Sequence, residues 1–411
     1  MFIYIIVGII LFMYVFDLLV SYLNYRNRHK PLPENVSDIY DEASYKKWLS
    51  YSMEQTKLGF IDSTFSIVVV IGLLIFGGFA LFNQWAESLS PNSYIFKTNL
   101  FILFYFAVYT LVSIPFSYIE TFKIEEKYGF NKSTRKTFIK DQVKNFLLMG
   151  SLLFGLVSGI TALFQAFKDQ LIFVMIGSWA LLVFITLLIA YLNTKVFVKI
   201  FNKLTPLEDG DLKDRIIEMA HQVGFEIKAI SIMDASKRTT KLNAFFSGMG
   251  KTREVVLFDT LMSKLSEDEI LAVLAHEFGH MVHKDIPKMM IQRMFMYLVF
   301  AGMLLLIFTT SNLFLDFNLP IQHVGFTLIL FTLFLEPIGL LLGVITNHLS
   351  RQAEYKADAY SASLIDKKHM LSALKKLVKE NFSNLNPHPL YEKIHYTHPK
   401  ISDRIKAIES L

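Results

Sequence analysis

The chain has 411 residues, of which 53% are hydrophobic and only 19% are charged, and its formal net charge at pH 7 is +5. Soluble domains carry about 25% charged residues, so the composition indicates a membrane protein rather than two or three water-soluble domains. The small net charge argues against a nucleic-acid partner. The absence of cysteine excludes disulfides, cysteine-ligated zinc, iron–sulfur clusters and thiol nucleophiles.

A helix that crosses a bilayer needs about 20 mostly apolar residues. Five internal stretches hold no Asp, Glu, Lys or Arg, and one stretch on either side of them is almost as apolar. The first stretch has no basic segment before it and no small-residue cleavage site after it, so we expect a retained span rather than a signal peptide. The sequence thus predicts seven transmembrane helices, at about 1–23, 64–82, 98–119, 146–167, 171–194, 294–315 and 322–348.

The loops between these spans alternate in their content of Lys and Arg. The first and third loops are rich in basic residues, whereas loops 83–97 and 168–170 hold one each and loop 316–321 holds none. Because short cytosolic loops are enriched in Lys and Arg, we expect the N-terminus outside and the C-terminus in the cytosol. The lack of Cys and the frequent Lys, Ile and Phe favour a low-GC bacterium, and hence a multi-pass protein of a bacterial cell (inner) membrane.

The long cytosolic segment between the fifth and sixth spans has the pattern of a folded α+β unit. Apolar residues at helical spacing predict an amphipathic helix over 210–224. Alternating apolar and polar residues predict a strand over 227–233, and 254–258 reads as a second strand.

An HExxH motif in this segment supplies three candidate functional residues, His276, Glu277 and His280. A capping-box pattern upstream, Ser266 with Glu269, predicts that the motif lies on a helix. The two histidines are one turn apart on one face, where both imidazoles can bind one Zn²⁺ ion at about 2.0–2.1 Å. Glu277 lies on the adjoining edge and can take a proton from the attacking water. The alternative is a chance pentapeptide on a surface helix.

A catalytic zinc ion needs a third protein ligand and an open position. His283 is on the same face as His276, but the rise of about 10.5 Å between them is too long for one ion. Neither the metzincin spacing nor a glutamate about 20 residues downstream is present. We therefore expect Glu354, beyond the last two spans, to be the third ligand, and Asp358, one turn later, to accept the N–H of a ligating imidazole.

Two alternatives to this ligand set remain. Arg351, Glu354 and Asp358 share one helical face, so they could form only a surface ion network. His348 and His398 are rival ligands, although neither lies in a comparable helical constellation.

These residues resemble the type I CAAX prenyl protease family, integral-membrane gluzincins that trim prenylated proteins. Besides the HExxH motif and the helix with Glu354 and Asp358, three blocks are similar to that family and follow in the same order: 124–131, 205–259, and His398-Pro399 with Arg404. The resemblance covers most of the chain. It implies seven helices that form a barrel around a large water-filled chamber, closed on the cytosolic side by a zincin-like metalloprotease domain.

The resemblance also implies roles for individual residues. Asn243, Ala244 and Phe245 are similar to the edge strand that pairs with extended substrate, although a plain buried strand end would have the same sequence. His398 and Arg404 are similar to family positions near the zinc ion, where they could polarise the scissile carbonyl or its oxyanion. His398 could instead cap a helix whose first residue is a proline.

Three acidic residues complete the candidates. We expect Glu125 and Glu126 to form a structural clasp to the zinc domain rather than to act in catalysis. Glu336, in the last span, is a functional candidate because an unpaired charge at that depth is costly, and we favour a place on the wall of the chamber.

The expected organisation has four parts: 1–194 with spans one to five, 195–293 as the cytosolic zinc-protease domain, 294–348 with spans six and seven, and 349–411 completing the zinc site. The expected function is a monomeric zinc endopeptidase with one catalytic ion that acts at the cytosolic membrane face. Its substrates would be peptides or proteins, prenylated or membrane-associated ones included. The alternatives are a membrane-protein quality-control protease, a type with usually about four spans, and a transporter or channel with a vestigial motif.

Overall fold

The computed structural model describes residues 1–247 and 252–411, so residues 248–251 of the predicted segment 195–293 lie outside the described part. Within the described residues, seven helices are long and apolar enough to cross a membrane, which confirms the predicted number. They are α1 (Phe2–Asn27), α2 (Glu42–Ile75), α4 (Tyr94–Ile119), α6 (Arg135–Phe167), α7 (Leu171–Leu192), α12 (Asp285–Thr309) and α14 (Val324–Leu364).

Shorter elements join these helices and build the rest of the molecule. A π-helical turn (Glu120–Glu125) and α5 (Glu126–Tyr128) prolong α4, and a second π-helical turn (Asn193–Phe197) and α8 (Val198–Phe201) prolong α7. The others are α3 (Gly78–Leu89), α9 (Asp211–Gln222), α10 (Asp259–Met262), α11 (Glu267–Val282), α13 (Ser311–Leu315), α15 (Lys367–Glu380), α16 (Pro389–His395) and α17 (Ile401–Glu409).

The last span is much longer than the sequence predicted. Helix α14 has 41 residues, which is about 60 Å at 1.5 Å per residue, twice the roughly 30 Å of a bilayer core. The expected boundary at 348 therefore falls inside one continuous helix. Its first part spans the membrane, and its second part, which carries Glu354 and Asp358, reaches into the protease end of the molecule.

The second span begins and ends earlier than predicted, as helix α2 with 34 residues. The expected helix over 64–82 is interrupted at Gly77, whose φ of 73° is a left-handed conformation that glycine adopts without strain. Helix α2 therefore ends at Ile75, and α3 starts a new direction.

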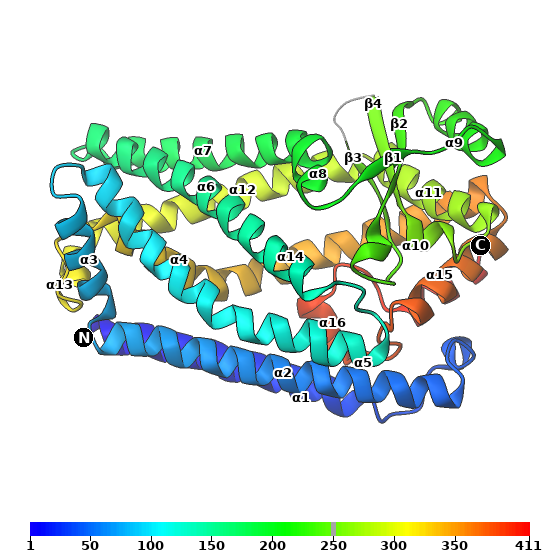
Figure 1. The fold of residues 1–411 in the computed structure, drawn as a ribbon, viewed down its shortest axis with the longest axis horizontal. Coiled ribbons are helices and arrows are strands. Elements are labelled where there is room, and N and C mark those ends of the chain that lie inside the picture. The colour runs from blue at the N-terminus through cyan, green and yellow to red at the C-terminus, as the bar shows by residue number, and fades with distance from the viewer. Residues whose placement is uncertain (248–251) are drawn as a thin grey trace.

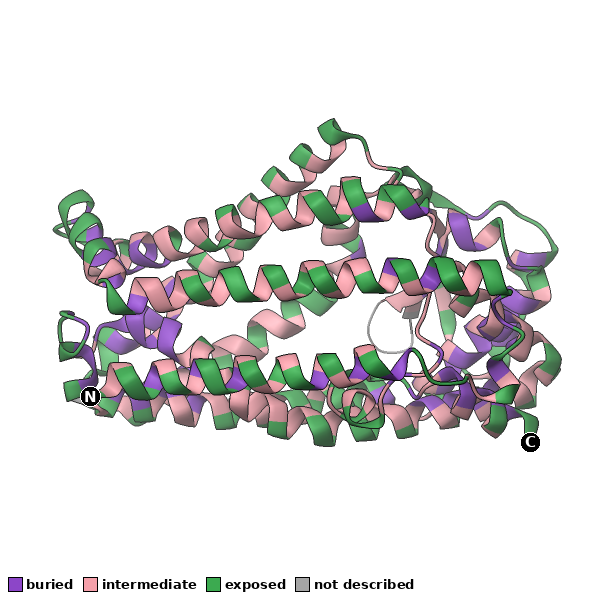
Figure 2. Ribbon diagram, turned by 90° about the horizontal axis from the view of Figure 1, so that it is seen from below, coloured by how far each residue is buried: buried purple, intermediate pink, exposed green. Residues whose placement is uncertain are grey.

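The seven helices form a closed ring. Each packs against the next in the order α1, α2, α4, α6, α7, α12, α14, and α14 packs back on α1. Only 6% to 22% of the residues in each apolar window are buried, whereas a solid bundle would bury one face of every helix. Figure 2 shows the buried residues gathered toward the two ends of the molecule. The ring is therefore a barrel whose middle is not a packed core, as expected for walls around a chamber.

One end of the barrel is closed by an apolar plug. It lies near the N-terminus, where α3 and α13 cross the ends of the long helices (Figure 1). Its side chains come from α1, α3, α4, α13 and α14 and include the fully buried Phe79, Phe101, Phe314 and Phe326. The buried His323 caps α14 and contacts Asn83 at 3.0 Å, so the polar groups of this end are also paired.

The opposite end carries a four-stranded sheet, counted over the described residues, in the order β1 (Leu204–Pro206), β2 (Glu226–Met233), β4 (Thr252–Phe258), β3 (Ala244–Ser247). The β2–β4 pair is parallel and the two outer pairs are antiparallel. The predicted helix over 210–224 is α9, and the two predicted strands are β2 and β4, so these expectations are confirmed. Strand β3 lies at the edge of the sheet, where the family resemblance placed Ala244 and Phe245.

Helices α11 and α14 cross at close range behind this sheet. A Cβ atom added to Gly279 would lie 2.9 Å from the Cα of Ala357 and 3.1 Å from the Cβ of Tyr360. Ser361 Oγ also donates a hydrogen bond of 2.7 Å to the carbonyl of Ala272. Only a glycine at 279 allows this approach, and the approach brings two segments that are far apart in sequence into one site.

We predict that Gly279→Ala pushes α11 away from α14. Overpacking of this kind costs about 1–3 kcal/mol, so thermal unfolding in detergent should occur at a lower temperature and bound metal should fall with it. Gly302→Ala in α12 is the matched control, because an added Cβ there meets nothing within 4 Å. An unchanged unfolding temperature and metal content in Gly279→Ala would show that the close contact at Gly279 determines neither stability nor metal binding.

Candidate metal centre

Helix α11 presents the HExxH motif, and its N-terminus is firmly anchored. Ser266 and Glu269 form the predicted capping box in both directions. The buried Glu269 carboxylate also accepts hydrogen bonds from Ser372 (2.6 Å) and Lys376 (2.7 Å) of α15. The Glu269 carboxylate thus takes part both in the helix cap and in the contacts to α15, and it fixes the start of α11 against α15.

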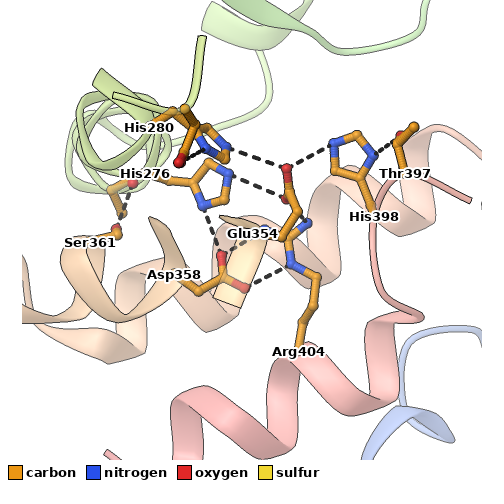
Figure 3. A network of polar contacts seen from close by, with 10 residues as sticks. His276, His280, Glu354, Asp358, Ser361, Thr397, His398 and Arg404 are labelled. Atoms are coloured by element: carbon orange, nitrogen blue, oxygen red, sulfur yellow. Dashed lines mark hydrogen bonds and ion pairs between the residues drawn. The ribbon is translucent and has the colours of Figure 1, made fainter. Parts of the chain in front are cut away.

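The structure brings His276, His280 and Glu354 together. One ligand atom from each lies within 4.8 Å of the others. Glu354 Oε2 is 3.5 Å from His276 Nε2, and Glu354 Oε1 is 3.3 Å from His280 Nε2. Figure 3 shows the two imidazoles pointing from α11 toward the glutamate of α14.

This donor set fits a single divalent cation. Two imidazoles and one carboxylate are a common set for catalytic zinc, and bonds of 2.0–2.1 Å in tetrahedral geometry place neighbouring donors about 3.4 Å apart. The observed 3.3 and 3.5 Å agree with that separation. In addition, the buried Oε2 of Glu354 accepts no hydrogen bond from the described residues and has only ion-pair contacts, with His276 and with Arg404, whereas a buried carboxylate oxygen normally accepts a hydrogen bond.

Outer carboxylates orient both imidazoles. Asp358 Oδ1 lies 2.8 Å from His276 Nδ1, in the place predicted for it. Asp285, which the sequence analysis missed, lies 3.1 Å from His280 Nδ1. It is buried in the first turn of α12, directly after Lys284, whose φ of 57° marks a sharp turn. The sequence signal that could have identified Asp285 is its position as an acidic residue five positions after His280.

Arg404 of α17 completes the polar network. Its Nε and Nη2 atoms donate to the two carboxylate oxygens of Asp358 at 2.8 and 2.6 Å. Its Nη1 atom lies 3.3 Å from Glu354 Oε2. The guanidinium is therefore engaged with two carboxylates, which holds Asp358 in position against His276.

The pKa values of His276 and Glu277 are both raised, for different physical reasons. Burial lowers the pKa of His276, but Asp358 and Glu354 outweigh it and raise this pKa to about 9. A cation that binds here therefore displaces a proton. Burial raises the pKa of Glu277 above the usual carboxyl value, against the smaller opposing effect of the two histidines. This shift brings Glu277 closer to the pKa of an effective general base at neutral pH.

A cavity of about 130 Å³ joins the predicted site residues. Its walls include Asn243, Ala244, His276, Glu277, Glu354, His398 and Arg404. The side chain of Phe245 packs on the other face of the sheet, near Met233 and Val256, so Phe245 can contribute only its main chain to the cavity.

Several rival assignments are not supported by the positions of the residues. His283 ends α11 and packs on Tyr360, with 5.9 Å between ring centroids. His348 is exposed on α14 and belongs to no metal-ligand cluster of the described residues. Arg351 does not join the Glu354–Asp358 network; its guanidinium donates to the carbonyls of Glu392 and Tyr396.

His398 lies at the mouth of the site. Its Nε2 is 3.3 Å from Glu354 Oε1, and 63% of its side chain is exposed. The helix-cap alternative is wrong, because α17 begins at Ile401 with Lys400 as its cap residue. Partial desolvation by the surrounding protein lowers the pKa of His398 and outweighs the opposing effect of Glu354, which favours the neutral imidazole.

Comparison with known proteins agrees with this geometry. The profile described as "CAAX prenyl protease N-terminal, five membrane helices" matches residues 21–203, and the profile "Peptidase family M48" matches residues 206–411. The chain is 31% identical to "CAAX prenyl protease 1 homolog" of Arabidopsis thaliana, over 98% of this chain and 96% of the relative. The chain belongs to the type I CAAX prenyl protease family.

Further relatives support the same assignment for this member of the type I CAAX prenyl protease family. "CAAX prenyl protease 1" of Saccharomyces cerevisiae is 32% identical, over 95% of this chain and 92% of the relative. The crystal structure of S. mikatae Ste24p superposes with a TM-score of 0.91 at 28% identity, covering 100% of this chain and 99% of that one. The chain is therefore an integral-membrane metalloendopeptidase, and the quality-control and transporter alternatives are not favoured.

We predict that Glu354→Gln removes most of the bound metal, because an amide is a poor substitute for the carboxylate ligand. Asp285→Asn should weaken metal affinity by about 10–100-fold, the usual effect of changing an outer partner of a ligating histidine. Elemental analysis of purified protein after dialysis measures both, and Glu336→Gln, on the same helix but far from the cluster, is the control. Full metal in Glu354→Gln, with loss in His348→Ala or His398→Ala, would contradict the ligand set.

Proposed function

We propose that the protein is a zinc endopeptidase that cuts extended segments of membrane-associated proteins at the cytosolic face of the membrane. The observation that carries this proposal is the convergence of His276, Glu277 and Glu354 on one cavity, with His280 in the same ligand cluster and the start of edge strand β3 on the cavity wall. The elements that carry the lining residues, α11, α15 and the start of β3, lie at the end of the molecule opposite α3 and α13, where the apolar plug is (Figure 1). A peptide that occupies the barrel can therefore reach the site without leaving the membrane protein.

We assign one Zn²⁺ ion to His276, His280 and Glu354. When bound, the ion supplies a Lewis acid that polarises the scissile carbonyl and makes water a stronger nucleophile. The two imidazoles and the carboxylate hold it, while Asp358 and Asp285 fix the ring orientations through the outer nitrogens.

Glu277 is the proposed general base and acid. Its carboxylate takes the proton of the attacking water and returns it to the nitrogen of the leaving amine. The raised pKa of the buried carboxyl supports both steps, because the group can hold the proton between them.

His398 is the proposed contact to the reacting carbonyl. Its exposed ring opens on the cavity, so a neutral imidazole N–H there can donate to the developing oxyanion. Arg404 is a positioning residue, because its donors are already occupied by Asp358 and Glu354.

The substrate backbone is proposed to pair with β3. Among the described residues this strand pairs only with β4, so its outer edge can accept an additional strand. Asn243 and Ala244 place that edge beside the metal ligands. The names of the relatives support prenylated C-terminal sequences as substrates that the enzyme is able to cleave.

The remaining proposals concern the setting of the enzyme. We place it in a bacterial cell membrane with the N-terminus outside and the metal centre in the cytosol, on the alternation of basic loops. We propose a monomer, because one chain supplies all of the named site residues. We also propose four functional parts, of which the second and fourth supply the proposed metal ligands: 1–194, 195–293, 294–348 and 349–411.

We predict that Glu277→Gln keeps its metal but loses cleavage. The amide preserves the shape of the side chain and cannot accept the proton, a step worth about 10²–10⁴-fold in rate. The assay is cleavage of a prenylated peptide by purified protein, followed by mass spectrometry. Glu267→Gln, at the start of the same helix, should retain activity. Cleavage near the unmodified rate by Glu277→Gln would remove Glu277 as the base.

We predict that a cysteine at Asn92 is labelled from outside the cell. Asn92 is exposed in the turn between α3 and α4, and the chain has no native cysteine that would react. A membrane-impermeant maleimide on intact cells should modify Asn92→Cys and spare Glu208→Cys, which becomes reactive only after lysis. The reverse pattern would invert the topology.

A further inference from the structure

The segment 238–242 leads directly into the proposed substrate-binding edge. It follows a short 3₁₀ turn (Ala235–Lys237) and ends next to Asn243, which lines the active-site cavity. We call it the lead-in segment. Contacts that hold the lead-in segment in place therefore also set the position of the start of β3 relative to the proposed metal ligands.

The loop between α4 and α6 holds the lead-in segment through the main chain. Asn131 and Thr239 form an isolated antiparallel bridge. Lys132 N donates to the carbonyl of Arg238 at 3.0 Å, and Thr240 N donates to the carbonyl of Phe130 at 3.2 Å. These two main-chain bonds flank the Asn131–Thr239 pair and make up the bridge, a short sheet-like contact between the membrane part and the protease part.

Two ion pairs reinforce this contact. Arg238 donates through Nε and Nη2 to both oxygens of Asp141, at 2.8 and 3.1 Å, and both side chains are about one-fifth exposed. Lys241 Nζ lies 3.1 Å from Glu125 Oε1, as the predicted clasp requires. The partly buried, bidentate Arg238–Asp141 pair holds its geometry better than a single exposed pair does.

Glu125 is itself rigidly placed. Its carboxylate accepts hydrogen bonds from Tyr51 and Gln55 of α2, and its main-chain carbonyl accepts from Phe130 N and Asn131 N. It ends the π-helical turn of α4, a type of irregularity that is frequent at functional sites. Lys241 is therefore anchored to two helices of the barrel at once.

Asn381 holds the other side of the lead-in segment. Its Oδ1 accepts from Leu242 N at 2.8 Å, and its Nδ2 donates to Leu242 O at 3.1 Å, so one amide satisfies both main-chain groups of the residue before Asn243. Asn381 ends α15, the helix that contributes Leu374 and Leu377 to the cavity.

We infer that Glu125, Asp141 and Asn381 are positioning residues for substrate binding, which set the location of β3 so that a peptide from the barrel reaches the metal centre in register. This inference rests on the proposed function. Among the described residues, no hydrogen bond or ion pair joins these three residues to His276, Glu277, His280 or Glu354. Their loss should therefore weaken the pairing of an extended substrate and leave the chemistry of the cleavage step intact.

The test compares two substrates in full-length protein. With a long internally quenched peptide, Asn381→Ala and Asp141→Asn should raise KM by roughly 5–50-fold and change kcat by less than about threefold, the pattern of lost uniform binding. With a peptide too short to pair along β3, kcat/KM should stay within about twofold of the unmodified enzyme. Metal content should not change.

Exchange of the charges supplies a rescue. Asp141→Arg alone should impair the long peptide, and Asp141→Arg with Arg238→Asp should recover most of the loss. Glu54→Gln is the matched control, because it removes an ion pair to Lys127 in the same region without touching the lead-in segment; it should leave KM unchanged.

The following outcomes of these experiments would contradict the positioning role of Glu125, Asp141 and Asn381. Equal losses on the two peptides, a fall in metal content, or no rescue by the exchanged pair would mean that these residues only stabilise the fold, and would overturn it. If Asp141→Arg does not fold, the Asp141→Asn and Asn381→Ala results decide alone. If the unmodified enzyme cleaves neither peptide, the proposed function fails instead, so the two failures are distinguishable.

Discussion

The close approach of α11 to α14 at Gly279 is the contact on which the active site depends. Two of the proposed ligands lie on α11 and one on α14, so the distance between these helices sets the spacing of the candidate ligand atoms. A side chain at 279 would meet the backbone of Ala357. The glycine inside the HExxH motif therefore has a packing role that is separate from the chemistry of its neighbours. The hydrogen bond from Ser361 to Ala272 fixes the same crossing about two turns earlier on α11 and one turn later on α14.

The charge balance around that crossing explains why a cation belongs there. Three carboxylates, of Glu354, Asp358 and Asp285, are buried. Arg404 pairs with two of them, and Lys288 approaches Asp285 only at 3.7 Å. Buried negative charge in excess of positive charge is costly unless a cation compensates it. The proposed divalent ion would supply that compensation, and its binding would displace the proton that the raised pKa of His276 favours.

The barrel and the protease part act as one unit because they exchange structural elements. Helix α14 is a membrane span and a ligand-bearing helix in the same 41 residues. The loop after α4 forms a bridge with the lead-in segment of the substrate edge. The last helix, α17, returns to pair Arg404 with Asp358. The barrel wall is therefore joined to the edge strand and to the proposed metal ligands through short, specific contacts.

Local patterns in the sequence determined the seven spans, the α9 helix, strands β2 and β4, the capped α11 helix and the pairing of His276 with His280, because each depends on residues within a few turns of one another. Glu354 and Asp358 also followed from helical spacing, once the motif required a third ligand. Only the tertiary structure decided that Asp285 supports His280, that Arg351 points away from the site, that His398 is no helix cap, and that Asn381 and Asp141 hold the lead-in segment. These relations join residues distant in sequence, and their distances are set by how helices cross, which no local pattern encodes.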